Sequence, residues 1–131
     1  PETRSVPGAY QNFQQGRMLW RSDTNSILVL DSNTGNFQQY PDTFQEGSDP
    51  EDSNETPPDG LYAPRRGFLK VWQNQAGVRE ALLWALQPEQ PATFTLQAFP
   101  NGAMLSVPGL NQILVFIGDS TGTWRSFNGT F

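Results

Sequence analysis

Two stretches of this 131-residue chain carry nearly the same hairpin: ILVLDSNTGNFQQY at residues 27–40 and ILVFIGDSTGTWRSF at residues 113–127. In each, a β-branched apolar run leads into a turn-forming loop, and an alternating segment with aromatic residues follows. Asp and Asn side chains turn the backbone through local hydrogen bonds, and Gly35 supplies a positive φ. We therefore predict two similar antiparallel β-hairpins.

The similarity continues upstream of both hairpins. FQQGRMLW at residues 13–20 aligns with FPNGAMLS at residues 99–106 without a gap, and one inserted residue in the second hairpin loop restores the register downstream. The matched positions include Phe13/Phe99, Gly16/Gly102, Met18/Met104, Ile27/Ile113, Gly35/Gly122, Tyr40/Phe127 and Phe44/Phe131. We interpret residues 13–44 and 93–131 as two copies of one β unit, each a three-stranded meander.

Alternation within GRMLWR indicates the two faces of the first strand of this unit. Met18 and Trp20 share one face, and Arg17, Leu19 and Arg21 share the other.

The segments between the copies have a different character. Residues 46–60 are acidic, rich in proline and almost free of hydrophobic residues, which is typical of a mobile surface loop or linker. Residues 61–90 contain two apolar groups at helical spacing: Phe68, Val71 and Trp72, then Val78, Ala81, Leu82 and Ala85. Gly77 separates the groups, so we predict two short helices, the second ended by Pro88. We expect one mainly β (β-rich α+β) domain spanning residues 1–131, with the helices packed as a lid or filler between two antiparallel meanders.

Composition excludes several function classes. The chain has no cysteine and no histidine, which removes disulfides, Cys/His zinc sites and histidine-based catalytic groups. Its net charge is −5, but the acidic residues concentrate around residues 46–60, and the remainder carries no basic stripe for nucleic acid. No apolar run approaches the roughly 18 residues of a membrane-spanning helix, so no membrane insertion is expected.

Candidate catalytic groups are scarce. Most carboxylates lie in the proline-rich segment or near the N-terminus, and a mobile segment does not hold a proton donor accurately enough for glycosidase chemistry. The single lysine, Lys70, lies among helix residues that are expected in the core, which disfavours a Ser–Lys nucleophile. We expect no enzyme activity and no cofactor.

The loop DSNTG offers one weak metal hypothesis. Asp31 and Asn33 alternate as oxygen ligands of calcium do, but a calcium loop needs more ligands and a bidentate glutamate. A turn is the favoured interpretation.

Aromatic residues support one ligand hypothesis. Aromatic faces pack on sugar rings, and amide or guanidinium groups hydrogen bond to hydroxyls. Core positions are expected for Trp20, Trp72 and Trp84. The predicted ligand-binding residues are Tyr40, Trp124, Gln38, Arg125 and Tyr62. N-glycosylation sequences begin at Asn54 and Asn128.

The motifs GRMLW at residues 16–20 and LLWA at residues 82–85 resemble those of the LGFP repeats of bacterial cell-surface proteins and of related modules in exported proteins of Chloroflexota-type bacteria. GRMLW is similar to the family's Gly-x-hydrophobic-aromatic-Trp strand, and LLWA occupies the place of its Leu-Gly-aromatic-Pro signature. Leu83 and Ala85 depart from the signature Gly and Pro, and Ser106 replaces the Trp in the second copy. The resemblance implies a non-catalytic extracellular module associated with the cell envelope.

We therefore expect a secreted cell-surface module that binds envelope glycan or another surface. The alternative is a structural subunit that assembles with copies of itself into an extracellular fibre or surface layer. Open edge strands at the end of the second copy, or residues 1–10 acting as a docking arm, would make the contacts between subunits.

Overall fold

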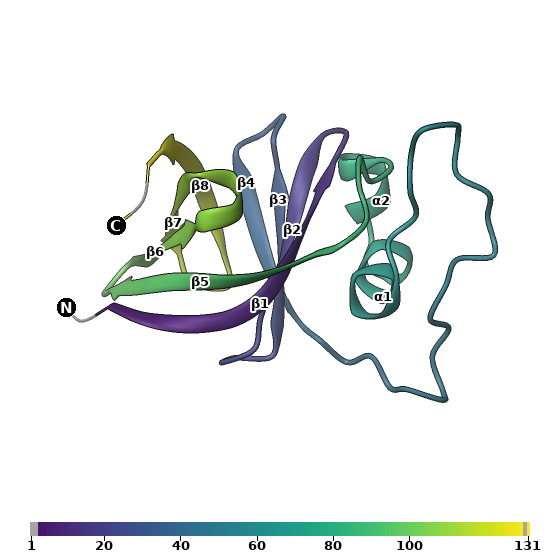
Figure 1. Cartoon of the computed structure of the whole chain (residues 1–131), viewed down its shortest axis with the longest axis horizontal. Coiled ribbons are helices and arrows are strands. Elements are labelled where there is room, and N and C mark those ends of the chain that lie inside the picture. Colours follow the sequence, from purple (N-terminus) through teal and green to yellow (C-terminus); the bar gives the residue numbers. More distant parts are fainter. Residues whose placement is uncertain (1–2, 130) are drawn as a thin grey trace.

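Eight antiparallel strands close into one barrel in the computed structural model, which describes residues 3–129 and 131 (Figure 1). The strands follow the order β1-β2-β3-β4-β8-β7-β6-β5 around the barrel. Their bounds are β1 Thr3–Phe13, β2 Gly16–Arg21, β3 Ser26–Asp31, β4 Asn36–Pro41, β5 Gln90–Phe99, β6 Gly102–Val107, β7 Gln112–Gly118 and β8 Thr121–Asn128. The helices are α1 Arg66–Asn74 and α2 Val78–Leu82, and a short 3-10 turn, η1, spans Pro108–Leu110.

The expected mainly β fold with two short helices is confirmed, but the arrangement of the strands differs from the prediction. The prediction of two three-stranded meanders is not confirmed as such, because each set of three strands belongs to a sequential group of four, β1–β4 or β5–β8, and the two groups close on each other. β1 joins β5 along eight residue pairs, whereas β4 joins β8 along three. Every strand has a neighbour on each side, but β8 extends past its three pairs with β4, so residues 125–128 at the end of the second copy have no β4 partner in the ladder.

The N-terminal segment is part of the barrel wall. Residues 3–10 of the expected docking arm lie instead in β1, which pairs with both β2 and β5, and residues 1–2 lie outside the described residues. Pro7 and Gly8 obscure this strand in the sequence, since both residues disfavour strand interiors. Gly8 is needed because a Cβ there would lie 2.0 Å from the carbonyl oxygen of Trp20 and 2.6 Å from the ring of Phe94.

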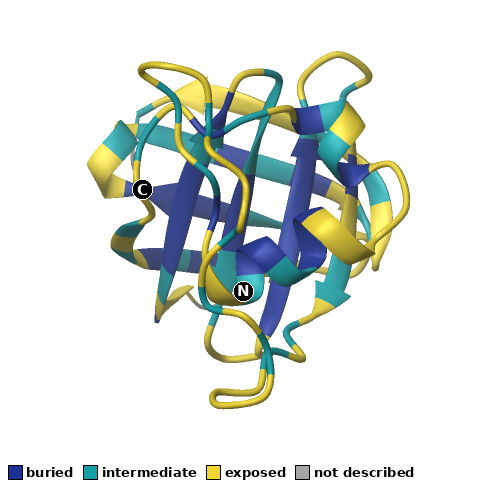
Figure 2. Ribbon diagram, turned by 90° about the vertical axis from the view of Figure 1, so that its right-hand side faces the viewer, coloured by how far each residue is buried: buried dark blue, intermediate teal, exposed yellow. Residues whose placement is uncertain are grey.

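Two hydrophobic clusters lie on opposite sides of the barrel wall. One fills the barrel interior and includes Phe37 and Phe94. The other lies outside β2 and β3, where Met18 and Trp72 belong to it together with other helix residues. All residues from Ser26 to Leu30 are therefore buried. Figure 2 shows these buried strand segments behind the helices, with exposed loops around them.

The helices cover the outside of the first four-stranded group. Their predicted position between two meanders is wrong, because α1 contacts β3 and α2 contacts β2 and β3 (Figure 1). Trp72 of α1 is buried in the outer cluster, and Trp20 and Trp84 pack against it half-buried. Among the described residues, no helix combines the length and the apolarity required to cross a membrane.

The second helix ends earlier than predicted. It stops at Leu82, six residues before Pro88, because Leu83 adopts a φ of +64° that breaks the helical path. The Leu83 carbonyl oxygen accepts a hydrogen bond of 2.7 Å from the Trp72 indole. Ala85, predicted to lie on the helix, instead forms isolated β-bridges with Phe13 and Tyr62. The chain is therefore extended where helical spacing indicated another turn.

The acidic segment at residues 46–60 has no helix or strand, but it is not a detached linker. Ion pairs connect its carboxylates to basic residues of the helical region: Asp49–Lys70 at 2.9 Å, Glu51–Arg66 at 2.9 Å, Asp52–Arg65 at 2.5 Å, and Glu55–Arg79. The guanidinium of Arg79 also lies 4.3 Å from the centre of the Trp72 ring and 5.1 Å from that of Trp84. The negative charge of the segment is therefore paired with the positive charge of the helical region beside it.

Candidate functional site

The five residues predicted to bind a ligand do not all meet at one place, although Tyr40 and Gln38 are neighbours. Tyr40 and Gln38 lie on the outer face of β4, where the Tyr40 hydroxyl donates a hydrogen bond to the Gln38 side chain and burial raises the pKa of Tyr40. Trp124 packs against the interior cluster, and its indole N–H donates to the Asp31 carbonyl oxygen at 3.1 Å. Arg125 is exposed on the opposite face of β8. Tyr62, 43% exposed, lies near Ala85.

The DSNTG loop uses its carboxylate to form the expected turn. Asp31 Oδ1 accepts the backbone N–H groups of Asn33 at 2.9 Å and Thr34 at 3.3 Å. Gly35, at a φ of +74°, closes the turn. Within residues 3–129 and 131, no three Asp, Glu, His or Cys side chains are grouped closely enough to hold a metal ion. In the two glycosylation sequences, Asn54 and Asn128 are exposed, and Thr130 lies outside the described residues.

One end of the barrel contains a cavity of about 740 Å³. The turns that follow β2, β5 and β7 surround it, contributing Thr24, Asn101 and Asp119. Eight strands enclose an interior that side chains fill or that holds one small ligand. The volume is within the range of about 300–1,000 Å³ that is usual for small-molecule sites.

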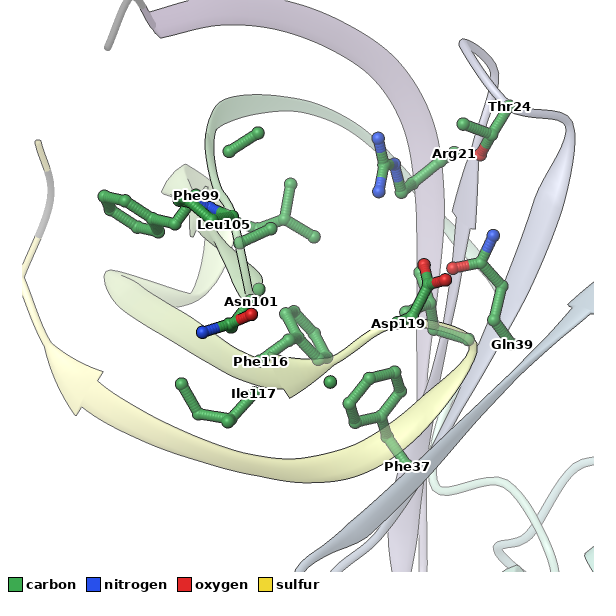
Figure 3. A pocket seen from close by; sticks show the side chains of 16 residues that line it. Arg21, Thr24, Phe37, Gln39, Phe99, Asn101, Leu105, Phe116, Ile117 and Asp119 are labelled. Carbon is green, nitrogen blue, oxygen red and sulfur yellow. The ribbon is translucent and has the colours of Figure 1, made fainter.

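Polar side chains line one side of this cavity. In Figure 3, Arg21, Gln39 and Asp119 lie along one side, and Leu105 and Phe116 lie across from them. Arg21 projects inward from β2, on the strand face that alternation assigned to it together with Arg17 and Leu19.

Asp23 fixes the orientation of Arg21. Arg21 Nε donates to Asp23 Oδ1 at 3.1 Å and Nη2 donates to Oδ2 at 2.8 Å, while Arg4 Nη2 reaches Oδ2 at 2.7 Å. Burial, the largest single influence, raises the pKa of Asp23, but the hydrogen bonds and charges of the two arginines together bring it below its usual range. Asp23 therefore stays ionised and leaves the two N–H groups of Arg21 Nη1 outside this pair.

Aromatic and aliphatic side chains form the apolar part of the cavity. The rings of Phe37 and Phe116 meet edge to face, with centroids 5.1 Å apart and planes at 77°. Leu28 and Leu105 continue this surface, and Ile117 lies at the exposed rim. The cavity is thus amphipathic, with apolar and hydrogen-bonding sides.

The opposite end of the barrel is filled. Arg17 Nε donates to Asn12 Oδ1 at 2.7 Å, and Nη1 donates to Gln112 Oε1 at 2.9 Å. Burial lowers the pKa of Arg17, partly offset by the charge of Tyr10. Gly109 of η1 lies over Tyr10, since a Cβ at this glycine would be 3.2 Å from the Tyr10 hydroxyl. These contacts restrict the candidate site to the other end.

Sequence reasoning did not find the cavity residues. Arg21 and Gln39 come from the first four-stranded group, and Asp119 comes from the second, so closure of the barrel is needed to bring Asp119 to the other two. The available signal was the alternation in GRMLWR, which places two arginines on the face opposite Met18 and Trp20. Comparisons with models of protein families, with curated proteins and with solved structures gave no significant match to this chain.

Proposed function

We propose that this protein is a non-catalytic binding module of the cell exterior whose open barrel end receives one sugar unit of an envelope glycan. The observation that carries the proposal is the amphipathic cavity, in which the oriented guanidinium of Arg21 lies opposite an apolar surface. A sugar presents both apolar C–H groups and hydroxyls. The first require apolar surface, and the second require convergent polar side chains such as Gln39 and Asp119.

Binding fits this cavity better than hydrolysis does. Asp119 is the single carboxylate among the residues that line it. Glycoside hydrolysis ordinarily uses two carboxyl groups that flank the scissile bond, about 5–9.5 Å apart. The other nearby carboxylate, Asp23, is engaged by Arg4 and Arg21, and its lowered pKa makes it a poor proton donor near neutral pH.

The proposal includes an origin for the barrel in two copies of one four-stranded unit. The pairing registers support it: Phe13↔Gly16 corresponds to Phe99↔Gly102, and Ile27↔Tyr40 corresponds to Ile113↔Phe127. The two seams between the units, where β1 pairs with β5 and β4 pairs with β8, support it too. Pro7 pairs with Thr93 and Asn36 with Thr123, which are equivalent positions in the alignment, as a two-fold axis through both seams requires. A two-fold related barrel has equivalent ends, of which one is filled and one holds the cavity.

A binding experiment tests the function. The purified chain is incubated with insoluble bacterial cell-wall polysaccharides, and the bound fraction is measured by co-sedimentation. Soluble fragments of a retained polysaccharide are then titrated while backbone amide shifts are recorded. We expect shifts around Arg21, Gln39 and Asp119. Arg21→Gln should weaken binding tenfold or more, because a charge-assisted hydrogen bond contributes about 1.5–3 kcal/mol.

Arg125→Ala is the matched control, since Arg125 is an exposed arginine outside the cavity. It should leave the affinity unchanged. Shifts concentrated at Tyr40 and Arg125, or an equal loss in the two arginine variants, would show that the cavity is not the glycan site. Retention of none of the polysaccharides would refute the function itself.

A further inference from the structure

The outer face of the second four-stranded group carries an apolar patch that neither α1 nor α2 covers. Its apolar residues are Phe99, Met104, Ile113, Val115, Ile117 and Phe127. Phe99, Ile117 and Phe127 are 40%, 57% and 53% exposed. The other three are half-buried. We call these six residues the β5–β8 face.

Strand register makes the β5–β8 face continuous. Met104 pairs with Val115, and Ile113 pairs with Phe127. Gly102 lies between Phe99 and Ile117, so no side chain separates these two. Side chains opposite each other on neighbouring strands lie about 4.5–5.5 Å apart at Cβ. The six residues therefore form one patch rather than scattered surface hydrophobes.

The corresponding face of the first group carries the same residues under cover. Phe13, Met18, Ile27 and Val29 correspond to Phe99, Met104, Ile113 and Val115 in both alignment and pairing register. The first four are 3%, 0%, 0% and 7% exposed. They share one cluster with the helix residues Phe68, Leu69, Val71, Trp72, Val78 and Leu82. In Figure 1, α1 and α2 lie on the side of β2 and β3, away from β6–β8.

A few positions differ between the outer face of the first group and the β5–β8 face, and these differences indicate the chemistry of a partner that would cover the β5–β8 face. Asp31 of the first face has Ile117 as its counterpart, which extends the apolar area. Gln38, which borders the groove beside Ala76 and Gly77 at the start of α2, has Arg125 as its counterpart. A cation in that place favours an acidic residue in the first turn of a helix, where the helix dipole also favours negative charge. Trp20 and Ser106 depart from the match, at a corner of the face.

We propose that the β5–β8 face is the docking site of an amphipathic helix pair of the α1–α2 kind. Such a partner presents Phe, Trp and Leu anchors at the spacing of Phe68, Trp72 and Leu82, and an acidic residue opposite Arg125. The two faces share their apolar residues and their register, and a helix pair is the occupant that covers those residues in the first group. Phe99 and Ile117 also line the cavity, but Met104, Ile113, Val115 and Phe127 lie outside it, so docking on these four residues is tested separately from glycan binding.

The test supplies such a helix pair covalently. A second copy of residues 45–90 is fused after Phe131, the position that aligns with Phe44. Hydrogen exchange of the amides of β6–β8 and the methyl resonance of Met104 report docking. We expect slower exchange and a shifted Met104 signal in the fusion relative to the original chain. The control fusion carries Phe68→Glu and Trp72→Glu in the added copy alone, so the barrel and its own helices stay intact.

Docking should be lost in the control fusion and in a fusion with Val115→Glu on the face. Equal exchange and an equal Met104 signal in the fusion, the control and the original chain would overturn the proposal. Self-association of the original chain that Val115→Glu abolishes would also overturn it, because a second copy would then be the occupant. Glycan binding measured on the same proteins separates this result from the fate of the proposed function.

Discussion

Met18 and Met104 provide a matched pair of positions for testing how the helices stabilise the barrel. Both are methionines on the outer face of the second strand of a four-stranded group, at the same register. Met18 is fully buried beneath the helices, and Met104 is half-buried without such cover. The substitution to Ala therefore removes the same atoms in both places, and only the surroundings differ.

Met18→Ala should destabilise the protein far more than Met104→Ala. Removing three heavy atoms costs about 0.8 kcal/mol for each buried methylene-sized group, or about 2.4 kcal/mol when burial is complete. The cavity left beneath the helices adds to this, since buried Met→Ala changes cost about 2–5 kcal/mol in all. Met104 should lose about 1 kcal/mol or less, because its environment is already partly water.

The measurement is urea unfolding followed by tryptophan fluorescence. With an m-value of about 1–3 kcal/mol per molar urea, a loss of about 3 kcal/mol lowers the midpoint by about 1 M or more. Circular dichroism of each variant before unfolding checks that the barrel forms. Losses that agree within about 0.5 kcal/mol in the two variants would refute the claim that the helices seal the first face and leave the second uncovered.

Three further predictions concern other parts of the molecule. Gly8→Ala should lower stability by about 1–3 kcal/mol or more, since its Cβ would lie 2.0 Å from the Trp20 carbonyl oxygen; thermal unfolding measures this, and an unchanged midpoint would contradict the close packing of β1 on β2. Leu83→Gly should preserve or raise stability, because Leu83 has a φ of +64°, which strains a leucine by about 1–3 kcal/mol and a glycine hardly at all. This gain balances or exceeds the extra backbone entropy that glycine loses on folding, about 0.5–1 kcal/mol. Leu86→Gly, at another exposed leucine, is the control in the same thermal unfolding assay. Acid should release the 46–60 segment, because hydrogen bonds from Lys70 and Arg79 lower the pKa values of Asp49 and Glu55. These contacts contribute fully above the ordinary carboxylate pKa of about 4 and are lost as the pH falls through the lowered values. The protection of the segment's amides, taken relative to the intrinsic exchange rate at each pH, should therefore be nearly constant from pH 5 to 8 and fall below about pH 4.

The early end of α2 illustrates how far periodicity can be used. Helical spacing from Val78 to Ala85 predicted a helix that reached Pro88, but Ala85 pairs with Phe13 and Tyr62 as extended chain. The spacing of Val78 and Leu82 is real, and both are buried in the outer cluster. Ala85 can be buried either on a further helical turn or on an extended chain that turns back onto the same surface. The spacing of apolar residues does not distinguish these two structures.

The candidate site was less accessible from sequence than the fold class was. The prediction that Tyr40 and Trp124 bind one ligand requires that their two strands present these rings on the same face. They are not at the same position of the unit, since Trp124 corresponds to Phe37, which faces inward, and Tyr40 corresponds to Phe127, which faces outward. Because side chains alternate between the two faces of a strand, two positions of the unit that are separated by an odd number of residues face opposite sides.

Local sequence determined the parts of this protein that depend on near neighbours. Three strands of each group, the DSNTG turn with Asp31 and Gly35, and the two short helices follow from alternation, turn chemistry and spacing, whose interactions span a few residues. Closure of the barrel depends on the pairing of β1 with β5 and of β4 with β8, between residues roughly ninety positions apart. Alternation shows that a strand has two faces, but β2 and β3 are buried on both, so the tertiary structure alone decided that the face of Arg21 lines a cavity and the face of Met18 holds the helices.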